Sequence, residues 1–560
     1  METSVAANEA TALEVVAGES SLRVQSRGVL PMLPHVLVWT ALTILFTSMV
    51  VHYSLTRGKL IVPAHYDDVT YLRDGLDKLD GFYRGGLSGL LSRTLIRPPH
   101  SPFSTFLAFV GDAIFGVHDW SPYAANGIII FGLLAFVDYL TRGLRPWHKA
   151  VAFGFVLTVP IAAQCVYEFR SDMAVGLLTT AIIVLLIEKP LVRSRLQYRT
   201  LIGCLLGITL LSKTSVFPIT LSLAGAALVA STVRDRLVFG KEASGRALAK
   251  AWATILLPAV LIPLPFYLRN RHEIYAYITV NALGENSDIW KLHASRLTHL
   301  LYYATGVGGR VMLGRHFALL AVVLLAAVAY VLARGRRAER ARAACYAFML
   351  LVTYAGPTVN PIKDPFLAVT FDFLAIAASL LALREFLSDA SPFIVRALAG
   401  GFFVFMLVAG AWWAKLPMYW GEVTRADVVT RNGYVHGLYG AIRSHDPTGD
   451  GQVLVGVTGV FVNADGLAYL ADKDGLNSIR FVSDFVNKDF AAFENRLNQS
   501  RFVVTGDPQN PEDDPSTPYT AMLDRTLAMI RSRRDFRLIG TFPAGGGKNY
   551  YVYERTAGAP

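Results

Sequence analysis

The sequence predicts an α-helical polytopic membrane protein with about eleven transmembrane helices, followed by a small C-terminal α/β domain. Three observations favour this class. Hydrophobic residues make up 53% of the 560 residues. Charged residues make up only 17%, against ~25% in ordinary soluble proteins. The tail beyond position 415 is polar and alternates strand-like with helix-like runs. This composition excludes a soluble multidomain enzyme and a disordered chain. A scaffold held by disulfides is excluded because the chain has only three cysteines.

The spans are predicted from apolar runs of roughly 17 residues or more, the shortest that cross a bilayer as a helix. Residues 1–30 are polar and are expected to form a cytoplasmic tail, and residues 31–414 form the transmembrane domain. The apolar stretch Leu201–Ala230 is broken by Ser212 to Ser215 and is interpreted as two short helices. The other nine predicted spans are Pro31–Ser54, Ser121–Leu140, Ala150–Val166, Asp172–Glu188, Ala251–Leu268, Phe317–Ala333, Ala343–Pro357, Phe366–Leu383 and Phe393–Trp413.

Basic residues favour this count. With the N-terminus in the cytoplasm, four loops on that side are basic, whereas the short loops of the other side hold one basic residue each, Arg170, Lys213 or Lys363. The excess of +11 therefore determines topology, and no nucleic-acid partner is expected. The basic loop residues are Arg142, Arg145 and Lys149; Lys189, Arg193, Arg195 and Arg199; Arg234, Arg236, Lys241, Arg246 and Lys250; and Arg334, Arg336, Arg337, Arg340 and Arg342.

Three larger pieces then lie on the outer face. Residues 55–120 form a first outer loop with juxtamembrane helices, including Phe103–Val117, which is too short to span. Residues 269–316 form a second outer loop, and residues 415–560 form the extracytoplasmic α/β domain. Its predicted elements are the strands Val453–Val462, Ile479–Val486, Phe502–Thr505 and Tyr550–Tyr553 and the helix Tyr519–Arg534.

Charged residues at the mouths of membrane helices are costly and are therefore functional candidates. On the outer face they are Asp67, Asp68, Arg97, His100, Glu168, Arg170, Asp172, Lys213, Arg269, Lys363 and Asp364. An Asp-Asp pair alone is also typical of a solvated turn or a helix N-cap. Near a membrane, two close carboxylates can raise one pKa and so tune a general base. Each single cation is also typical of interfacial snorkelling.

The order of these motifs resembles the GT-C glycosyltransferases, in particular the dolichyl-phosphate-mannose mannosyltransferase and aminoarabinose transferase branch. An acidic pair follows the first span, Pro98-Pro99 opens a surface helix, and an Arg-x-Asp element opens a later span. Leu211-Ser212-Lys213, Lys363-Asp364 and the segment from Pro265 to Asn270 resemble further motifs of that group. Two positions depart from the pattern, Asp68 in place of Glu and Arg97 in place of His.

The resemblance implies an integral-membrane enzyme that moves a sugar from a polyprenyl-phosphate carrier to a glycan, lipid or protein acceptor, with inversion. Asp67 matches the general base, and Arg170, Lys213, Arg269 and Lys363 are expected to stabilise the leaving phosphate. Some relatives hold a divalent cation near the acidic pair, so one is conceivable beside Asp67, but no obligatory metal is expected. The implied location is the inner membrane of a bacterium, among membrane lipids, with the C-terminal domain outside.

Two other functions stay open. One is an oligosaccharide transferase or ligase of the same fold that uses a pyrophosphate-linked lipid donor. The other is a lipid or solute transporter, which the clustering of charge at one face instead of the bilayer midplane disfavours. Two further motifs are interpreted as turns. Ala544–Lys548 lacks the leading Gly and the Ser/Thr of a phosphate loop, and Asp446–Gly451 lacks the last acidic ligand of a calcium loop.

Overall fold

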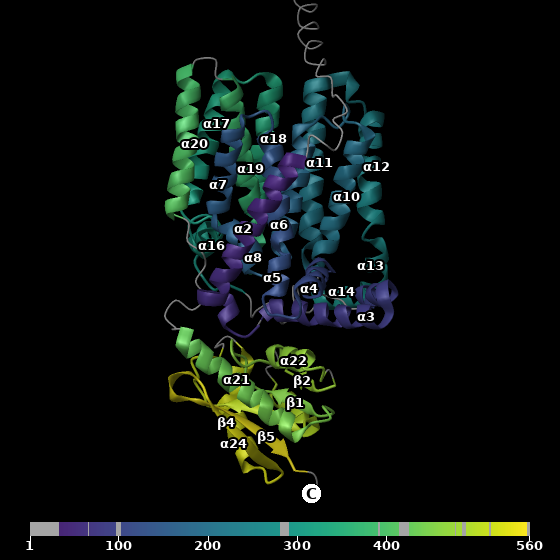
Figure 1. Ribbon diagram of the computed structural model, residues 1–560. Coiled ribbons are helices and arrows are strands. Elements are labelled where there is room, and N and C mark those ends of the chain that lie inside the picture. Colours follow the sequence, from purple (N-terminus) through teal and green to yellow (C-terminus); the bar gives the residue numbers. More distant parts are fainter. Residues whose placement is uncertain are drawn as a thin grey trace, which may run out of the picture.

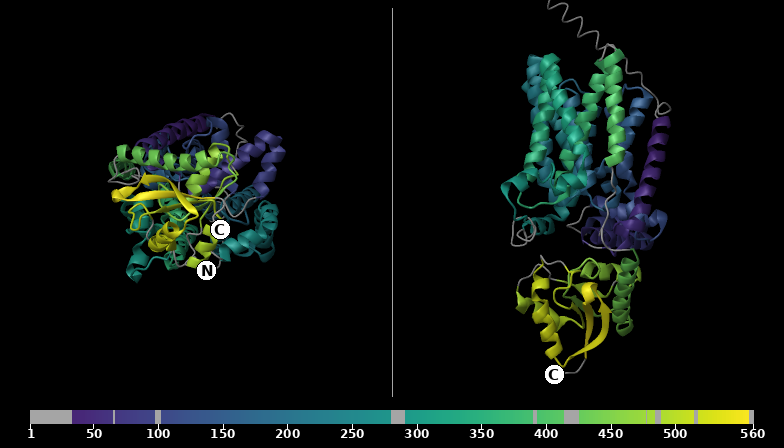
Figure 2. Two further views of the ribbon diagram at one scale, coloured as in Figure 1. Left: turned by 90° about the horizontal axis from the view of Figure 1, so that it is seen from below. Right: turned by 90° about the vertical axis from the view of Figure 1, so that its left-hand side faces the viewer.

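The computed structural model describes residues 33–64, 66–96, 102–279, 291–389, 393–413, 425–476, 478–483, 489–513 and 517–556. They form a bundle of long helices and a mixed α/β domain that lies against one end of it (Figure 1). The predicted cytoplasmic tail, residues 1–30, lies outside the described residues. The side view in Figure 2 shows the α/β domain beneath the bundle, at the end where several short helices run across it.

Each of the eleven predicted spans coincides with a helix or a helix pair. They are α2 (Leu33–Arg57), α5 with α6 (Ser121–Ala125, Gly127–Leu140), α7 with α8 (Pro146–Thr158, Pro160–Tyr167), α9 (Asp172–Glu188), α10 (Leu196–Ser212), α11 (Phe217–Phe239), α12 (Gly245–Leu261), α17 (His316–Arg334), α18 (Arg337–Val359), α19 (Val369–Asp389) and α20 (Phe393–Trp413). By length and apolarity alone, five described helices can cross a membrane, or six with the bent pair α7 and α8. Helices α9, α10 and α12 have only 17 residues, and the first two turns of α18 are charged.

Two breaks shape the bundle. The span Ala150–Val166, predicted as one helix, is bent by 62° between α7 and α8. Val159 has an extended backbone there (φ −71°, ψ 131°), because the ring of Pro160 disfavours the helical conformation of the preceding residue. The predicted break in Leu201–Ala230 is confirmed. Lys213 is extended between α10 and the 3₁₀ turn η4 (Thr214–Val216).

The first outer loop is more regular than predicted. It contains η3 (Lys59–Ile61), the 31-residue helix α3 (Tyr66–Ile96), kinked at Gly86, and α4 (Pro102–Phe115), the surface helix predicted at Phe103–Val117. Helices α3 and α4 pack closely, since a Cβ atom on Gly75 would lie 2.4 Å from the Cβ of Ala108. The described part of the second outer loop contains the short helices α14 (Arg271–Ile278), α15 (Arg296–Leu301) and α16 (Val307–Met312). The predicted span Ala251–Leu268 is not one helix, since α12 ends at Leu261 and a separate short helix, α13 (Leu264–Arg269), follows.

The C-terminal domain holds a five-stranded sheet of order β2-β1-β3-β5-β4. Strands β1, β2 and β3 are parallel, and β3, β5 and β4 are antiparallel neighbours. The bounds are α21 (Arg425–His445), β1 (Gln452–Val455), α22 (Ala464–Lys473), β2 (Arg480–Val482), α23 (Phe490–Gln499), β3 (Phe502–Gly506), α24 (Pro518–Ser532), β4 (Phe536–Pro543) and β5 (Asn549–Arg555). The predicted strand Val453–Val462 is too long, and β4 was not predicted.

Both motifs interpreted as turns are turns. The 3₁₀ turn η9 (Gly545–Gly547) joins the antiparallel strands β4 and β5, as expected for a hairpin. Asp446 accepts a hydrogen bond from the backbone N–H of Gly451 at 2.7 Å and so closes the turn between α21 and β1.

The domain is docked through shared cores. Ile61 and Val62, which follow the first span, pack with the hydrophobic core of the C-terminal domain. Conversely, Tyr469 of α22 is buried in the core of the helical bundle. Ion pairs flank this contact, Arg73–Asp472 at 2.6 Å and Lys473–Asp119 at 2.9 Å. The domain therefore lies on the same side of the bundle as Asp67 and Asp68, as the helix count predicted.

Candidate functional site

A buried charged cluster lies where the bundle meets the C-terminal domain. The Lys59 ammonium donates to the Asp68 carboxylate at 2.7 Å and also to Glu168. The exposed fractions of the three side chains are 6%, 1% and 13%. We call these three residues the Lys59 cluster. It joins three segments that are far apart in the sequence: the turn after α2, the start of α3 and the loop between α8 and α9.

Close packing brings Lys59 to its partners. Gly58 lies against Tyr167, so that a Cβ atom on Gly58 would be 2.6 Å from the tyrosine ring. Since Tyr167 immediately precedes Glu168, this contact sets the η3 turn beside the loop that carries the glutamate. Only a residue without a side chain allows that approach.

Asp68 is held by three donors on one oxygen. Its Oδ2 accepts hydrogen bonds from Lys59, from the Tyr123 hydroxyl at 2.7 Å and from the Phe169 N–H at 3.1 Å. Its Oδ1 is buried and accepts no hydrogen bond from the described residues. Asp68 is therefore fixed in one orientation, with one oxygen available to a further donor.

The cluster separates the pKa values of its two carboxyls. Burial alone would raise the pKa of Asp68, but the Lys59 ammonium and the hydrogen bonds from Lys59 and Tyr123 hold it below its usual range. For Glu168, burial raises the pKa above its usual value despite the attraction of Lys59. Burial opposes the charge on Lys59, yet both carboxylates together raise the pKa of this ammonium. Of the two carboxyls, Glu168 therefore takes up a proton more readily than Asp68.

The loop from Glu168 to Asp172 carries two more ion pairs. Arg170 pairs with Asp364 at 3.0 Å, and its guanidinium lies 4.2 Å from the centre of the Phe366 ring. Asp172, the first residue of α9, pairs with Lys213 at 2.7 Å. Within five residues, this loop contacts the Lys59 turn, the loop before α19 and the break between α10 and α11.

Lys363 and Arg269 differ from these residues. Lys363 donates to the backbone carbonyls of Pro357 and Thr358 at 2.7 and 2.8 Å, and burial lowers the pKa of its ammonium. Arg269 ends α13 with an exposed side chain. None of the ion pairs within the described part of the chain links Arg269 to the Lys59 cluster or to Arg170.

Three predicted site residues lie wholly or partly outside the described part of the structure. Asp67 is the second residue of α3, directly before Asp68, but its side chain lies outside the described part of the structure. Arg97 and His100 lie outside the described residues altogether. The structure therefore brings together Asp68, Glu168, Arg170, Asp172, Lys213 and Asp364 from the predicted set.

Sequence reasoning missed Lys59 and Tyr123. Lys59 follows the predicted end of the first span by five residues, where a single lysine is the ordinary flank of a membrane helix. Tyr123 lies in an apolar run and carries no charge. The burial of a lysine distinguishes this site, and burial depends on tertiary contacts that no local pattern reports.

Comparisons with known proteins bear on the fold. No protein-family model and no curated protein sequence matches the chain. The crystal structure of ArnT from Cupriavidus metallidurans bound to undecaprenyl phosphate is similar over 92% of this chain and 98% of that one. The identity is 13% and the TM-score 0.52. The chain thus has the GT-C glycosyltransferase fold of a multi-pass membrane protein, and at this identity the likeness defines the fold alone.

Two structures of the Archaeoglobus fulgidus oligosaccharyltransferase are more distant. The apo form is 13% identical, with a TM-score of 0.42, and the match covers 83% of this chain and 69% of that one. The form tethered to an acceptor peptide is 12% identical, with a TM-score of 0.43 over the same shares. The fold assignment rests on the first comparison.

Proposed function

We propose that this protein is an integral-membrane glycosyltransferase that moves a sugar from a polyprenyl-phosphate carrier to an acceptor on the extracytoplasmic face. The observation that carries the proposal is the Lys59 cluster, a set of buried charges at the end of a GT-C bundle. Buried charges are costly unless they serve a site or are closely matched. Here one lysine faces two carboxylates, so the cluster retains unmatched negative charge beside the predicted base.

The two aspartates take different roles in this proposal. A general base needs a pKa close to the working pH. Asp68 does not suit that role, because Lys59 and Tyr123 hold the pKa of its carboxyl low. We assign the proton transfer to Asp67 and a positioning role to Asp68, whose hydrogen bonds fix the first turn of α3. Asp67 takes the proton of the acceptor hydroxyl as the oxygen attacks the anomeric carbon, and the opposite bond to phosphate breaks, which inverts that centre.

The leaving phosphate needs cations, and the nearby ion pairs can supply them. Arg170 and Lys213 are 17% and 18% exposed, and they pair with the carboxylates of Asp364 and Asp172. An incoming phosphate can replace either carboxylate, and Lys363 adds a third positive charge. Arg97, His100 and Arg269 remain donor-binding candidates by resemblance.

A cavity of about 550 Å³ supports a lipid-linked donor. It is mostly apolar and lies between α2, α5 and α6, from Thr40 to Val51 on α2. Its lining includes Ala124. The preceding residue is Tyr123, whose hydroxyl donates a hydrogen bond to Asp68. A prenyl chain in this cavity would have its phosphate end near the Lys59 cluster.

No obligatory metal ion enters the proposal. The Lys59 ammonium already lies between Asp68 and Glu168 and supplies the positive charge there. The described residues contain no group of three or more His, Cys, Asp or Glu side chains that could hold a metal. Chelator treatment is expected to leave transfer unchanged.

Replacement of Asp67 tests the proposal. Asp67→Asn should lower sugar transfer by at least ~100-fold, because the amide cannot accept the proton. The matched control is Asp80→Asn on the same helix, whose exposed ion pair with Arg84 lies away from the cluster. Purified protein would be supplied with a labelled polyprenyl-monophosphate sugar and membranes of the source cells as acceptor. Substantial turnover by a folded Asp67→Asn protein contradicts the assignment.

The donor class is tested in parallel. Transfer only from pyrophosphate-linked oligosaccharides would favour the oligosaccharide transferase alternative. Movement of a lipid or solute across sealed vesicles, without sugar transfer, would favour a transporter. The C-terminal domain is proposed to help bind the acceptor and to supply neither the catalytic acid nor the base. The proposed location of the whole protein is the inner membrane of a bacterium.

A further inference from the structure

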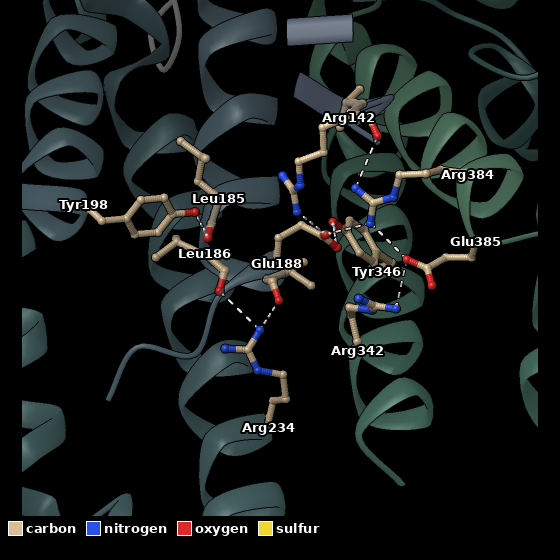
Figure 3. Close-up of polar contacts among 12 residues, drawn as sticks. Arg142, Leu185, Leu186, Glu188, Tyr198, Arg234, Arg342, Tyr346, Arg384 and Glu385 are labelled. Carbon is tan, nitrogen blue, oxygen red and sulfur yellow. Dashed lines mark hydrogen bonds and ion pairs between the residues drawn. The ribbon is translucent and has the colours of Figure 1, made fainter. Parts of the chain in front are cut away.

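At the end of the bundle opposite the C-terminal domain, three arginines converge on two glutamates (Figure 3). Glu188, at the end of α9, pairs with Arg142 at 3.4 Å and with Arg384 at 3.2 Å. Glu385 pairs with Arg384 at 2.9 Å and with Arg342 at 3.4 Å. Three guanidinium groups against two carboxylates leave one positive charge unmatched.

The unmatched charge lies on the two outer arginines. Arg384 is only 10% exposed and has the shorter ion pairs with both glutamates. Arg342 and Arg142 are 29% and 42% exposed, and their ion pairs are the longer ones. Both outer guanidinium groups can therefore take a further anionic partner without loss of the inner pairs.

An apolar cavity of about 170 Å³ opens beside this cluster, between α17, α18 and α19. Arg342, Tyr346, Glu188 and Glu385 form its polar end, and Glu339, also there, is neutralised by its pair with Arg336 at 3.0 Å. Small side chains leave the space for the cavity: Ala327, Ala343, Ala347, Ala378 and Ala382. The cavity combines an apolar slot with a polar end that holds one arginine and three glutamates, and Arg142 and Arg384 pair with two of these glutamates from outside the lining.

We propose that this cavity binds one anionic glycerophospholipid, separate from the proposed sugar-transfer site. An acyl chain fills the slot between α17 and α18, and the phosphodiester accepts hydrogen bonds from Arg342. One phosphodiester charge brings the three arginines and two glutamates to neutrality. The four basic loops lie at this end of the bundle, which on the positive-inside rule faces the anionic cytoplasmic leaflet.

Lipid binding tests the headgroup assignment. The full chain would be purified in detergent, depleted of lipid and titrated with phosphatidylglycerol, phosphatidylethanolamine or phosphatidylcholine, with binding followed by native mass spectrometry. Phosphatidylglycerol should bind about tenfold more tightly than either zwitterionic lipid. All three lipids offer the same phosphodiester to Arg342, but the two zwitterionic headgroups also bring a cationic amine close to the arginines, which phosphatidylglycerol lacks. Equal binding of the three lipids, or tighter binding of a zwitterionic one, overturns the proposal.

Two matched pairs of variants test where on the protein the lipid binds. Arg342→Gln should weaken phosphatidylglycerol binding about tenfold, whereas Arg195→Gln, an exposed loop arginine at the same end, should not. Ala347→Phe should block the slot, whereas Ala344→Phe, on α18 but outside the lining, should not. Thermal unfolding without lipid checks that each variant is folded. If the members of a pair behave alike, the lipid binds elsewhere and the proposed site is wrong; if Ala347→Phe does not fold, Ala382→Leu takes its place.

Discussion

Lys59 is one cation between two carboxylates, so the cluster is neutral only when one of the carboxyls is protonated. As the pH falls, Glu168 takes up a proton before Asp68, because burial raises the pKa of Glu168 while Lys59 and Tyr123 keep the pKa of Asp68 low. Without Lys59, two carboxylates would share a nearly dry space. Such an arrangement is far more costly than the intact cluster.

We therefore expect Lys59→Met to lower the free energy of unfolding by about 3–5 kcal/mol, the usual cost of breaking a buried ion pair. Thermal unfolding of the detergent-purified protein measures this loss. Adding Glu168→Gln to Lys59→Met should recover part of it, because one uncompensated carboxylate is removed. If the double variant is less stable than Lys59→Met, the cluster is held by packing and not by charge.

At the scale of elements, the η3 turn links the end of the bundle that carries the Lys59 cluster to the C-terminal domain. Ile61 and Val62 pack in the core of that domain, and Asn432 of α21 donates a hydrogen bond to the Ile61 carbonyl at 2.7 Å. Lys59 is only two residues away. The position of the lysine therefore depends on whether the domain is docked.

Reversal of one docking ion pair should expose Lys59. Arg73→Asp places two carboxylates together where Arg73 and Asp472 now pair at 2.6 Å, so the domain should loosen. Labelling of Lys59 by an amine reagent, read by mass spectrometry, should then increase. Adding Asp472→Arg should restore protection. Equal labelling of Lys59 in the wild-type protein and in Arg73→Asp would mean that the η3 turn is held by the bundle alone.

The same docking contact is expected to depend on pH through Asp112 of α4. Burial raises the pKa of this carboxyl to about 7, and Lys473 and Asp119 are the charged groups that act on it. Because the folded pKa lies above the ordinary value, the stabilisation is present at low pH and is lost as the pH rises through about 7.

Asp112→Asn should remove this loss. The melting temperature of the wild-type protein should fall as the pH rises from about 4 towards about 7 and should level off above that, and the variant should show a smaller fall over the same range. Asp80→Asn, at a half-buried position on α3, serves as the control. Identical pH profiles for wild type and Asp112→Asn would contradict the expectation.

At the scale of the whole molecule, the bundle has two chemically different ends. One carries the Lys59 cluster and the C-terminal domain, and the other carries the arginine-rich loops (Figure 1). In a cysteine-free background, Gln509→Cys, at an exposed position shortly after β3, should react with a membrane-impermeant thiol reagent in intact cells.

A cysteine at Arg195 is the complement, since it lies in a basic loop at the other end and should react only after lysis. Labelling of Gln509→Cys only after lysis would reverse the orientation. It would also place the proposed transfer site in the cytoplasm.

The features that the sequence predicted well are those with a local signal. Apolar runs gave the spans, and the polar interruption at Lys213 gave the break between α10 and α11. Helix α3 was missed because its charges and glycines conceal a helical repeat of Val69, Leu72, Leu76 and Leu79. Strand β4 was missed because Arg537 and Gly540 interrupt its apolar pattern. The partners of Lys59 and Glu188 depend on segments 9 to 196 residues away, a separation that no local pattern spans.

The loop from Glu168 to Asp172 has a consequence for ligand affinity. Each of its charged side chains already has a partner, so an entering phosphate exchanges partners instead of adding a contact. The number of ion pairs then changes little on binding, and the affinity should respond only weakly to ionic strength. The displaced carboxylate then needs a new partner: Asp364 is 36% exposed and can be hydrated, whereas Asp172 is only 5% exposed. An anion is therefore expected to displace the partner of Arg170 at lower cost than the partner of Lys213, because an unpaired buried carboxylate is costly.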